Sequence, residues 1–167
     1  IPSNIKIISA NAFHFCTNLN HVNFSNNSEL QSIEESAFLR TNIKEITIPA
    51  HVSNIGKCAF TACTNLEHVN FPDNSELQSI EEYAFSHSNI KEITLPPHVS
   101  IIFNGAFDSC KNLEYVNFSD NSELQSIEKG AFKETNIKEI FIPPQLEDLR
   151  SILYSRTKYL TKIEISP

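Results

Sequence analysis

Four cysteines and six histidines are the side chains of this 167-residue chain best suited to hold a metal or to attack a substrate. Zinc and redox motifs usually contain two cysteines close together, and no Cys-x-x-Cys pair occurs here. His21 and His68 alternate with glutamates in one repeating column, and two ligand types in one column do not make a tetrahedral zinc cage. We therefore expect no metal site and no cofactor.

Catalytic and nucleotide-binding motifs are not visible in the sequence either. The three glycines, Gly56, Gly105 and Gly130, each come shortly before an Ala-Phe pair, so none belongs to a phosphate-binding loop. Every Asp, Glu and His falls at a repeated position, whereas an active site is usually built from residues that occur once. The sequence predicts that the chain is not an enzyme and has no catalytic residues.

The overall charge and hydropathy exclude two classes of partner. The formal net charge is −7, and a nucleic-acid backbone requires a basic surface. No apolar stretch reaches the roughly 18 residues of a membrane-spanning helix. The first residues have neither a basic region nor an apolar run, so we expect no signal peptide and no direct membrane insertion in this segment. The lack of methionine suggests a processed chain or a piece of a longer one.

The whole chain is organised by an internal repeat. The octapeptide NSELQSIE occurs three times, with 47 residues from one copy to the next, at 27–34, 74–81 and 121–128. The same offset divides one domain, 1–167, into three double repeats and a diverged last coil: 5–51, 52–98, 99–145 and 146–167. Each double repeat has a half of 25 residues and a half of 22, so we expect about seven strand-bearing coils.

Each half repeat carries the pattern L-x-x-V-x-F-x-x-N or I-x-x-I-x-I-x-x-H, which is typical of leucine-rich repeats. The alternation at Val69 and Phe71 predicts a short strand with one buried face, and the residues after it predict a turn. Further along, 81–85 is expected to form one short helical turn. The prediction is an α/β leucine-rich-repeat solenoid, with a parallel sheet on the concave face, short helical or irregular segments on the convex side, and a spine of stacked phenylalanines.

The repeat resembles the BspA-like leucine-rich repeats of bacterial and protist surface proteins, which include trichomonad-type BspA-like surface antigens. The residues that carry the resemblance follow I-x-x-x-A-F-x-x-C-x-N-L and then x-x-V-x-F-P: Ile55–Phe60, Cys63, Asn65-Leu66 and Val69–Pro72. It covers 1–145 strongly and 146–167 weakly. The resemblance implies a cell-surface or secreted protein of adhesion and interaction, with no catalytic residues to carry over.

Stacked coils place equivalent residues in columns, about 4.8 Å apart per strand. Cys16, Cys63 and Cys110 share one column at intervals of two coils, roughly 10 Å, and a disulfide needs Cα atoms within about 7 Å. We expect these three to be small buried side chains beside the phenylalanine spine. Cys58 has no equivalent in the pattern, and a local bridge from it to Cys63 stays open.

A further column lies at the turn that follows each strand. Amide and imidazole side chains alternate in it, and both can bond to backbone groups that a turn leaves exposed. We predict a structural ladder made of Asn27, His51, Asn74, His98, Asn121 and Gln145.

The outward columns of the sheet are the predicted place for a ligand. Charges of opposite sign alternate along two of them, which either stabilises the strand register or forms a recognition surface. Tyr115 and Phe141 place aromatic rings on this otherwise polar face, and exposed aromatics are typical of interfaces. The predicted contacts with a protein or glycan ligand are His68, Asn70, Glu92, Thr94, Tyr115, Asn117, Glu139 and Phe141.

A structural spacer or self-assembling array is the alternative function. Open solenoid ends expose strand edges and core residues unless they are capped. Residues of the diverged last coil are therefore predicted to pack on a second copy and form a homodimer: Tyr154, Tyr159 and Leu160. The two functions are compatible.

The identity of NSELQSIE in three places needs its own explanation. Its Asn belongs to the predicted ladder, and its Leu and Ile point into the core. The other five positions, Ser, Glu, Gln, Ser and Glu, are expected on the turn and outer side, where packing does not demand identity. A recent duplication of the 47-residue unit is the interpretation that the sequence favours.

Overall fold

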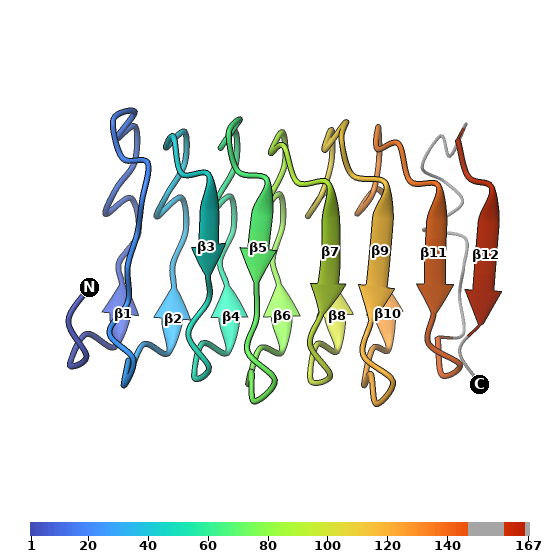
Figure 1. The fold of residues 1–167 in the computed structure, drawn as a ribbon, viewed down its shortest axis with the longest axis horizontal. Coiled ribbons are helices and arrows are strands. Elements are labelled where there is room, and N and C mark those ends of the chain that lie inside the picture. The colour runs from blue at the N-terminus through green and yellow to red at the C-terminus, as the bar shows by residue number, and fades with distance from the viewer. Residues whose placement is uncertain (147–158, 166–167) are drawn as a thin grey trace.

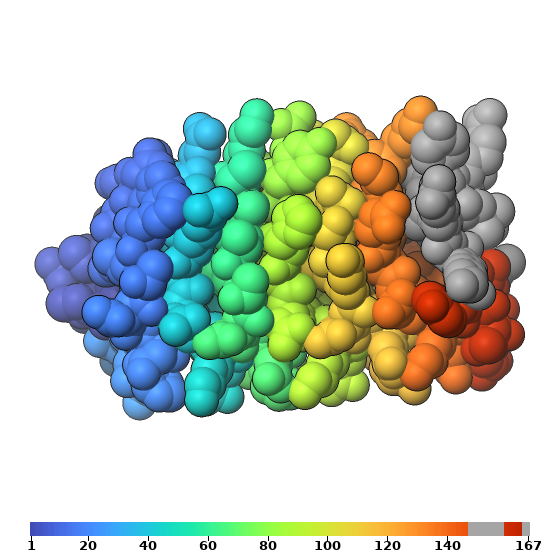
Figure 2. Space-filling model, turned by 90° about the horizontal axis from the view of Figure 1, so that it is seen from above, coloured from blue at the N-terminus to red at the C-terminus, as the bar shows by residue number. Residues whose placement is uncertain are grey.

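The computed structural model describes residues 1–146 and 159–165, which form an array of stacked coils with residue 1 at one end and residues 162–165 at the other (Figure 1). Successive coils run through the array in sequence order, and the space-filling view shows them as adjacent bands (Figure 2). The predicted parallel β-solenoid is therefore confirmed. No helix occurs among the described residues, and so none there could span a membrane.

The predicted strands form one face of the array, which we call the long-strand sheet. They are all parallel where they pair, and their residues alternate between the core and the outside, as in Glu92–Leu95, where Ile93 and Leu95 are buried. The strands are β3 (Glu45–Thr47), β5 (His68–Asn70), β7 (Glu92–Leu95), β9 (Tyr115–Phe118), β11 (Glu139–Ile142) and β12 (Lys162–Ile165).

The long-strand sheet is interrupted rather than continuous. β3 pairs with β5, and β7, β9, β11 and β12 pair in that order, but no backbone hydrogen bonds join β5 to β7. The two strands still lie side by side (Figure 1). In the first coil, residues 20–24 are not strand at all. Pairing within this face is therefore weaker at the β5–β7 step than at the next step along the chain.

A second parallel sheet runs unbroken along the array, and the sequence pattern did not predict it. Its strands have only two residues each, too few to show a period of alternation. In each strand the first residue is exposed or half-buried and the second is buried. In order they are β1 (Ile7–Ile8), β2 (Ser32–Ile33), β4 (Asn54–Ile55), β6 (Ser79–Ile80), β8 (Ile101–Ile102) and β10 (Ser126–Ile127).

The segment predicted as one helical turn, 81–85, is irregular, so the helical alternative was wrong at this place. Tyr83 and His87 have φ of 57° and 58°, a left-handed conformation that ends any helical turn. Hydrogen bonds alternate instead: Ala84 N–H donates to Glu81 C=O within the coil at 3.1 Å, and Phe85 N–H donates to Ala106 C=O of the next coil at 2.8 Å. Positive φ recurs at these two positions in every coil from 11–15 to 130–134, so the turns stack as a third ladder.

The phenylalanine spine is confirmed. Neighbouring rings stack with centroids 5.1–5.4 Å apart and planes within 11° of parallel. This spacing follows from the distance between coils, and offset stacking of aromatic rings adds to the hydrophobic burial. The spine consists of Phe13, Phe38, Phe60, Phe85, Phe107 and Phe132, and all but Phe13 are fully buried.

All four cysteines are free thiols, so the bridge from Cys58 to Cys63 does not form in the structure. Cys63 and Cys110 are buried as predicted, but Cys16 is exposed, because its coil has a neighbouring coil on one side only. The Cys110 thiol donates to Phe85 C=O at 3.1 Å and lies 3.2 Å from the Ser88 hydroxyl. Burial raises the pKa of Cys110 to about 12.

Candidate ligand-binding face

The predicted contact residues all lie on the outward side of the long-strand sheet. Register pairing puts Glu92, Tyr115 and Glu139 side by side on β7, β9 and β11. The contacts on β5 and β7 are exposed, Tyr115 is 39% exposed, and Asn117, Glu139 and Phe141 are half-buried. The structure thus brings these side chains onto one face, and ligand binding there stays a prediction.

Three open grooves follow this face. A groove of about 450 Å³ lies where β5 and β7 are not hydrogen-bonded, and its lining includes His68, Asn70, Glu92 and Thr94. One of about 870 Å³ lies along the first two coils, over residues 21–29 and 45–51. A third, of about 540 Å³, adjoins Tyr115. Two of the three grooves therefore coincide with places where strand pairing on this face is absent.

Most lysines on the face are neutralised within the chain. Lys91 Nζ lies 2.6 Å from a Glu67 carboxylate oxygen, and Lys138 Nζ lies 2.7 Å from one of Glu114. The hydrogen bond from Lys91, together with its charge, lowers the pKa of Glu67. These two pairs alternate in sign along one column, as the sequence predicted.

Carboxylates of the neighbouring column are left without such partners. Glu45, Glu92 and Glu139 form no salt bridge with a described residue. Lys162 stands opposite Glu139 in the register, but its Nζ bonds to Glu164 at 2.7 Å. Among the described residues, Glu92 at the centre of the face therefore has an exposed carboxylate without a salt-bridge partner.

The two aromatic residues on the face differ in their surroundings. Lys162 Nζ lies 5.4 Å from the centroid of the Phe141 ring, which is half-buried. Tyr115 has no such cover, and its ring borders the 540 Å³ groove with His68, Lys91, Glu92, Asn112 and Glu114. Tyr115 is thus the more exposed of the two predicted aromatic contacts on this face.

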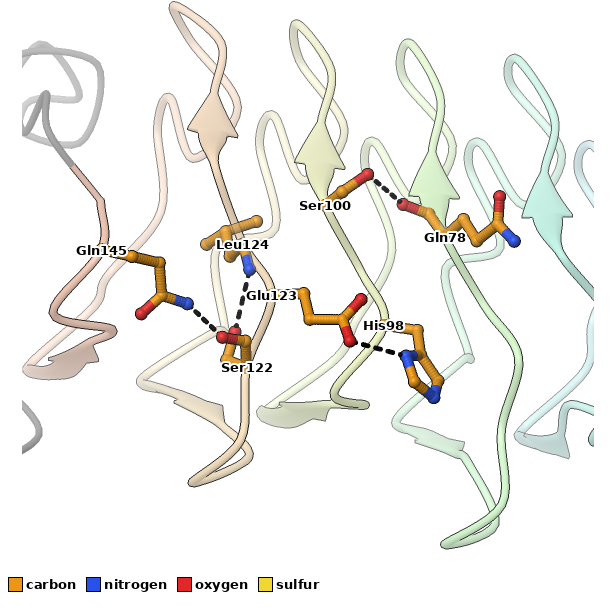
Figure 3. A network of polar contacts seen from close by, with 7 residues as sticks. All are labelled: Gln78, His98, Ser100, Ser122, Glu123, Leu124 and Gln145. Carbon is orange, nitrogen blue, oxygen red and sulfur yellow. Dashed lines mark hydrogen bonds and ion pairs between the residues drawn. The ribbon is translucent and has the colours of Figure 1, made fainter.

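The predicted turn ladder has different partners from those expected (Figure 3). His98 Nδ1 lies 3.1 Å from the Glu123 carboxylate, and His51 Nδ1 lies 3.0 Å from that of Glu76, so both imidazoles contact side chains rather than the backbone. The Gln145 amide does donate to a backbone carbonyl, that of Ser122. The three asparagines of the column are exposed: Asn27, Asn74 and Asn121.

A different column of asparagines forms side-chain contacts from coil to coil, and the sequence reasoning missed it. Asn65 Nδ2 donates to Asn42 Oδ1 at 2.8 Å, Asn112 donates to Asn89 in the same way, and Asn136 Nδ2 donates to a backbone carbonyl at 2.7 Å. The signal was present, because Asn recurs here in each of six coils: Asn18, Asn42, Asn65, Asn89, Asn112 and Asn136.

The polar residues of NSELQSIE are less free than the sequence suggested. Ser75 is 1% exposed, and its hydroxyl accepts a hydrogen bond from Leu77 N–H at 3.4 Å, as Ser28 and Ser122 do in their copies. The carboxylate of Glu81 accepts a hydrogen bond from Lys57 N–H of the preceding coil at 3.1 Å, and the other two copies do the same. The expectation that structure does not demand these residues was wrong for both positions.

The residues predicted for self-association lie at the last coil. Tyr159 is 48% exposed, whereas Leu160 is partly buried against the core. Tyr154 falls outside the described residues.

The stacked parallel strands, the phenylalanine spine and the asparagine column define a leucine-rich-repeat solenoid. The family described as BspA type leucine rich repeat region matches residues 1–76 and 31–161, with six copies of its repeat, and the chain belongs to this family. No curated protein sequence matches the chain. Proteins of leucine-rich repeats are in general scaffolds for protein interaction rather than enzymes.

Solved structures with the same fold come from bacteria. A leucine-rich repeat protein from Bacteroides ovatus is 30% identical, with a TM-score of 0.69 over 87% of this chain and 43% of its own. Pneumococcal vaccine antigen PcpA is 21% identical, with a TM-score of 0.64 over 96% of this chain and 35% of its own. The T. pallidum leucine-rich repeat protein is also 21% identical, with a TM-score of 0.62 over 84% of this chain and 65% of its own.

The last two comparisons show the fold alone, because their identity is low. In all three cases this chain spans less than two thirds of the length of the relative.

Proposed function

We propose that this chain is a non-catalytic interaction module that binds a protein or glycan ligand through the long-strand sheet. In this proposal it acts at a cell surface or after secretion, as an adhesion or recognition protein. The observation that carries the proposal is the exposed Glu92 carboxylate, which has no salt bridge with a described residue, beside the exposed Tyr115 side chain at the centre of the face. Solenoids bind through extended surfaces, since each coil adds a row of side chains.

The shape of the grooves supports a macromolecular ligand. They are open along the sheet and continue from strand to turn, as in the groove that extends from His68 to Asn121. A metabolite is usually bound in a concave pocket that buries most of its surface, whereas a protein or glycan contacts a broad face. The surface location is proposed from the family.

Charge reversal on the face provides the test. We expect the double variant E92K/E139K to lose binding to cultured host cells, purified matrix proteins or a glycan array, whichever of these the native chain binds. The matched control is E76K/E123K, which changes the net charge equally but alters the turn edge, where these carboxylates contact His51 and His98. Equal binding by E92K/E139K and the native chain would contradict the proposal.

Self-association is a second candidate, favoured by exposed apolar side chains in the last coil. Tyr159 is 48% exposed and Ile163 is 42% exposed. Sedimentation velocity over a wide concentration range should then show a dimer that Y159A weakens. A strict monomer at the highest concentration would remove this candidate and would leave the ligand-binding proposal intact.

A further inference from the structure

We propose that Tyr115 and Glu92 form a recognition site for an arginine side chain of a protein ligand. The guanidinium group stacks on the tyrosine ring and donates hydrogen bonds to the Glu92 carboxylate. This inference rests on the proposed function, in which the long-strand sheet binds a protein, and it names the chemical group that the centre of the sheet recognises.

The geometry brings the aromatic ring and the carboxylate together. Glu92 and Tyr115 are register partners on the hydrogen-bonded strands β7 and β9, so their side chains leave the same face on adjacent strands. Neighbouring strands are about 4.8 Å apart, which is near the distance at which a cation over an aromatic ring also reaches a neighbouring carboxylate. Both residues line the 540 Å³ groove, which is open to solvent and has room for a long side chain.

The charges around Tyr115 favour a cation in this groove. Lys91 and Lys138 would repel one, but each is held by its own carboxylate, Lys91 by Glu67 and Lys138 by Glu114. Glu92 has no salt bridge with a described residue and is exposed. The chain as a whole carries a net charge of −7, which also attracts a basic partner.

The two sides of Tyr115 are not equivalent. Glu139 is its register partner on β11, but Lys162 stands opposite that carboxylate on β12. Lys162 also has its pKa raised by its hydrogen bond to Glu164, with a further contribution from Glu139. Because Glu92 lines the 540 Å³ groove together with Tyr115 and Glu139 does not, the bound guanidinium lies on the β7 side, between Tyr115 and Glu92.

Arginine fits this site better than lysine does. Its planar guanidinium can stack on an aromatic face and donate two parallel hydrogen bonds to one carboxylate. The lysine ammonium is a compact, strongly hydrated charge that cannot do both in the same geometry. The site therefore discriminates between the two cations, which simple charge attraction would not do.

The chain contains its own comparison sites. The residue equivalent to Tyr115 is His21 in the first double repeat and His68 in the second, and Glu45 is the register partner of His68. Tyr83 is as exposed as Tyr115, at 38% against 39%, but its ring lies against Gly105 and its hydroxyl accepts a hydrogen bond from Asn104. The proposal predicts arginine binding at Tyr115 and at neither of these places.

An NMR titration of the full chain with three blocked tripeptides tests the inference. The probes are Gly-Arg-Gly, Gly-Lys-Gly and Gly-citrulline-Gly, and citrulline keeps the shape of arginine without its charge. We expect the arginine peptide to shift the ring signals of Tyr115 and not those of Tyr83. The lysine peptide should bind at least about threefold more weakly, and the citrulline peptide should not bind, because the charge-assisted hydrogen bonds are lost.

Variants locate the site. Y115A, E92Q and Y115H should each weaken arginine binding by about fivefold or more, as expected for loss of a cation–π contact or a charged hydrogen bond. Y115F should retain it, because the aromatic face remains. E45Q is the matched control for charge, and E139Q should have a smaller effect than E92Q.

Two outcomes overturn the inference: equal shifts from the arginine and lysine peptides, or unchanged arginine binding by E92Q. The same variants then separate this inference from the proposed function. If the peptides do not bind while E92K/E139K still loses the macromolecular ligand, the arginine site is wrong and the binding face stands. If E92K/E139K retains that ligand, the proposed function fails independently of the peptide result.

Discussion

Polar side chains on the turn side of the coils and polar side chains on the long-strand sheet have opposite roles. On the turn side, Ser75 and Glu81 bond to backbone N–H groups, and both are identical in all three copies of the octapeptide. On the sheet, the side chains of Lys91 and Glu67 bond to each other, while Glu92 has no salt bridge with a described residue. There the residue at the Tyr115 position changes between histidine and tyrosine from one double repeat to the next.

This difference separates what the fold requires from what remains free to vary. A buried backbone N–H must find an acceptor, so a side chain that supplies one is tied to its position. An exposed pair on the sheet contributes little to stability and is screened by salt. Variation can therefore accumulate on the sheet without loss of the fold, which is consistent with the proposal that this face binds the ligand.

The largest expected effect concerns the buried thiols of Cys63 and Cys110, compared with the exposed thiol of Cys16. At pH 8 the Cys110 thiol should react with iodoacetamide about a thousandfold more slowly than a thiol with the ordinary pKa of 9.0, because burial raises its pKa to about 12. Cys63, whose pKa burial also raises, should be protected too, whereas the exposed Cys16 should react readily. Peptide mapping after timed alkylation measures the relative reaction rates of the thiols, and denaturant should abolish the differences between them.

The raised pKa of Cys110 also determines how the stability of the fold depends on pH. A pKa raised in the folded state means that folding favours the protonated Cys110 thiol. Its contribution to stability is present below pH 9.0 and is lost as the pH rises toward 12. Equal alkylation rates for Cys16 and Cys110 in the native chain would show that the Cys110 side chain is open to solvent, and the contrast between buried and exposed polar groups would then fail.

The second effect is intermediate in size and lies within the octapeptide itself. Ser75→Ala should lower the free energy of unfolding by about 1–2 kcal/mol, since it leaves the Leu77 N–H without its acceptor in a buried place. Ser79→Ala is the matched control, because Ser79 is equally invariant but its side chain has no hydrogen bond with a described residue. Its effect should stay within about 0.5 kcal/mol in urea unfolding. If the two variants were equally destabilised, invariance in the octapeptide would not follow backbone bonding.

The fold could be predicted from the sequence because repetition multiplies a weak signal. One coil has a single short alternation at Val69 and Phe71, but the same spacing in six further coils leaves few alternatives to a parallel solenoid. The strands of two residues, such as β6, could not be predicted, because alternation needs more positions to be visible. The turns at Tyr83 and His87 were missed because left-handed φ is uncommon for residues other than glycine, and the stacked coils impose it here.

The candidate face was only partly predictable. The alternation of positive and negative charges along one column predicted the salt bridge between Lys91 and Glu67, because the repeat fixes which residues of neighbouring strands lie side by side. The sequence could not show which charges remain unpaired. Lys162, for example, forms its salt bridge with Glu164 of its own strand and not with Glu139, its register partner on β11. Nor could the sequence show that β5 and β7 are not hydrogen-bonded, which is where one groove lies. Such choices depend on distances between coils that the residue pattern does not contain.

The smallest expected effect on stability is the most informative for function. Exchanging the partners of one ion pair, in the double variant E67K/K91E, keeps the pair and the net charge while it reverses the local pattern of the sheet. We expect a melting temperature equal to that of the native chain at pH 7. The single variant K91E should be slightly less stable at low salt and should recover in high salt, because both groups are exposed.

Lowering the pH should remove this small difference in stability between K91E and the native chain. The hydrogen bond from Lys91 lowers the pKa of Glu67, so the contribution of the pair to stability is present above pH 4.5 and is lost as the pH falls below it.

Ligand binding by E67K/K91E should weaken although its stability is unchanged, because the exchange puts a positive charge near His68 and a negative one near Glu92. A variant that kept both its melting temperature and its ligand would mean that this column has no part in recognition, and the binding site would then be confined to the neighbouring column of Glu92 and Tyr115.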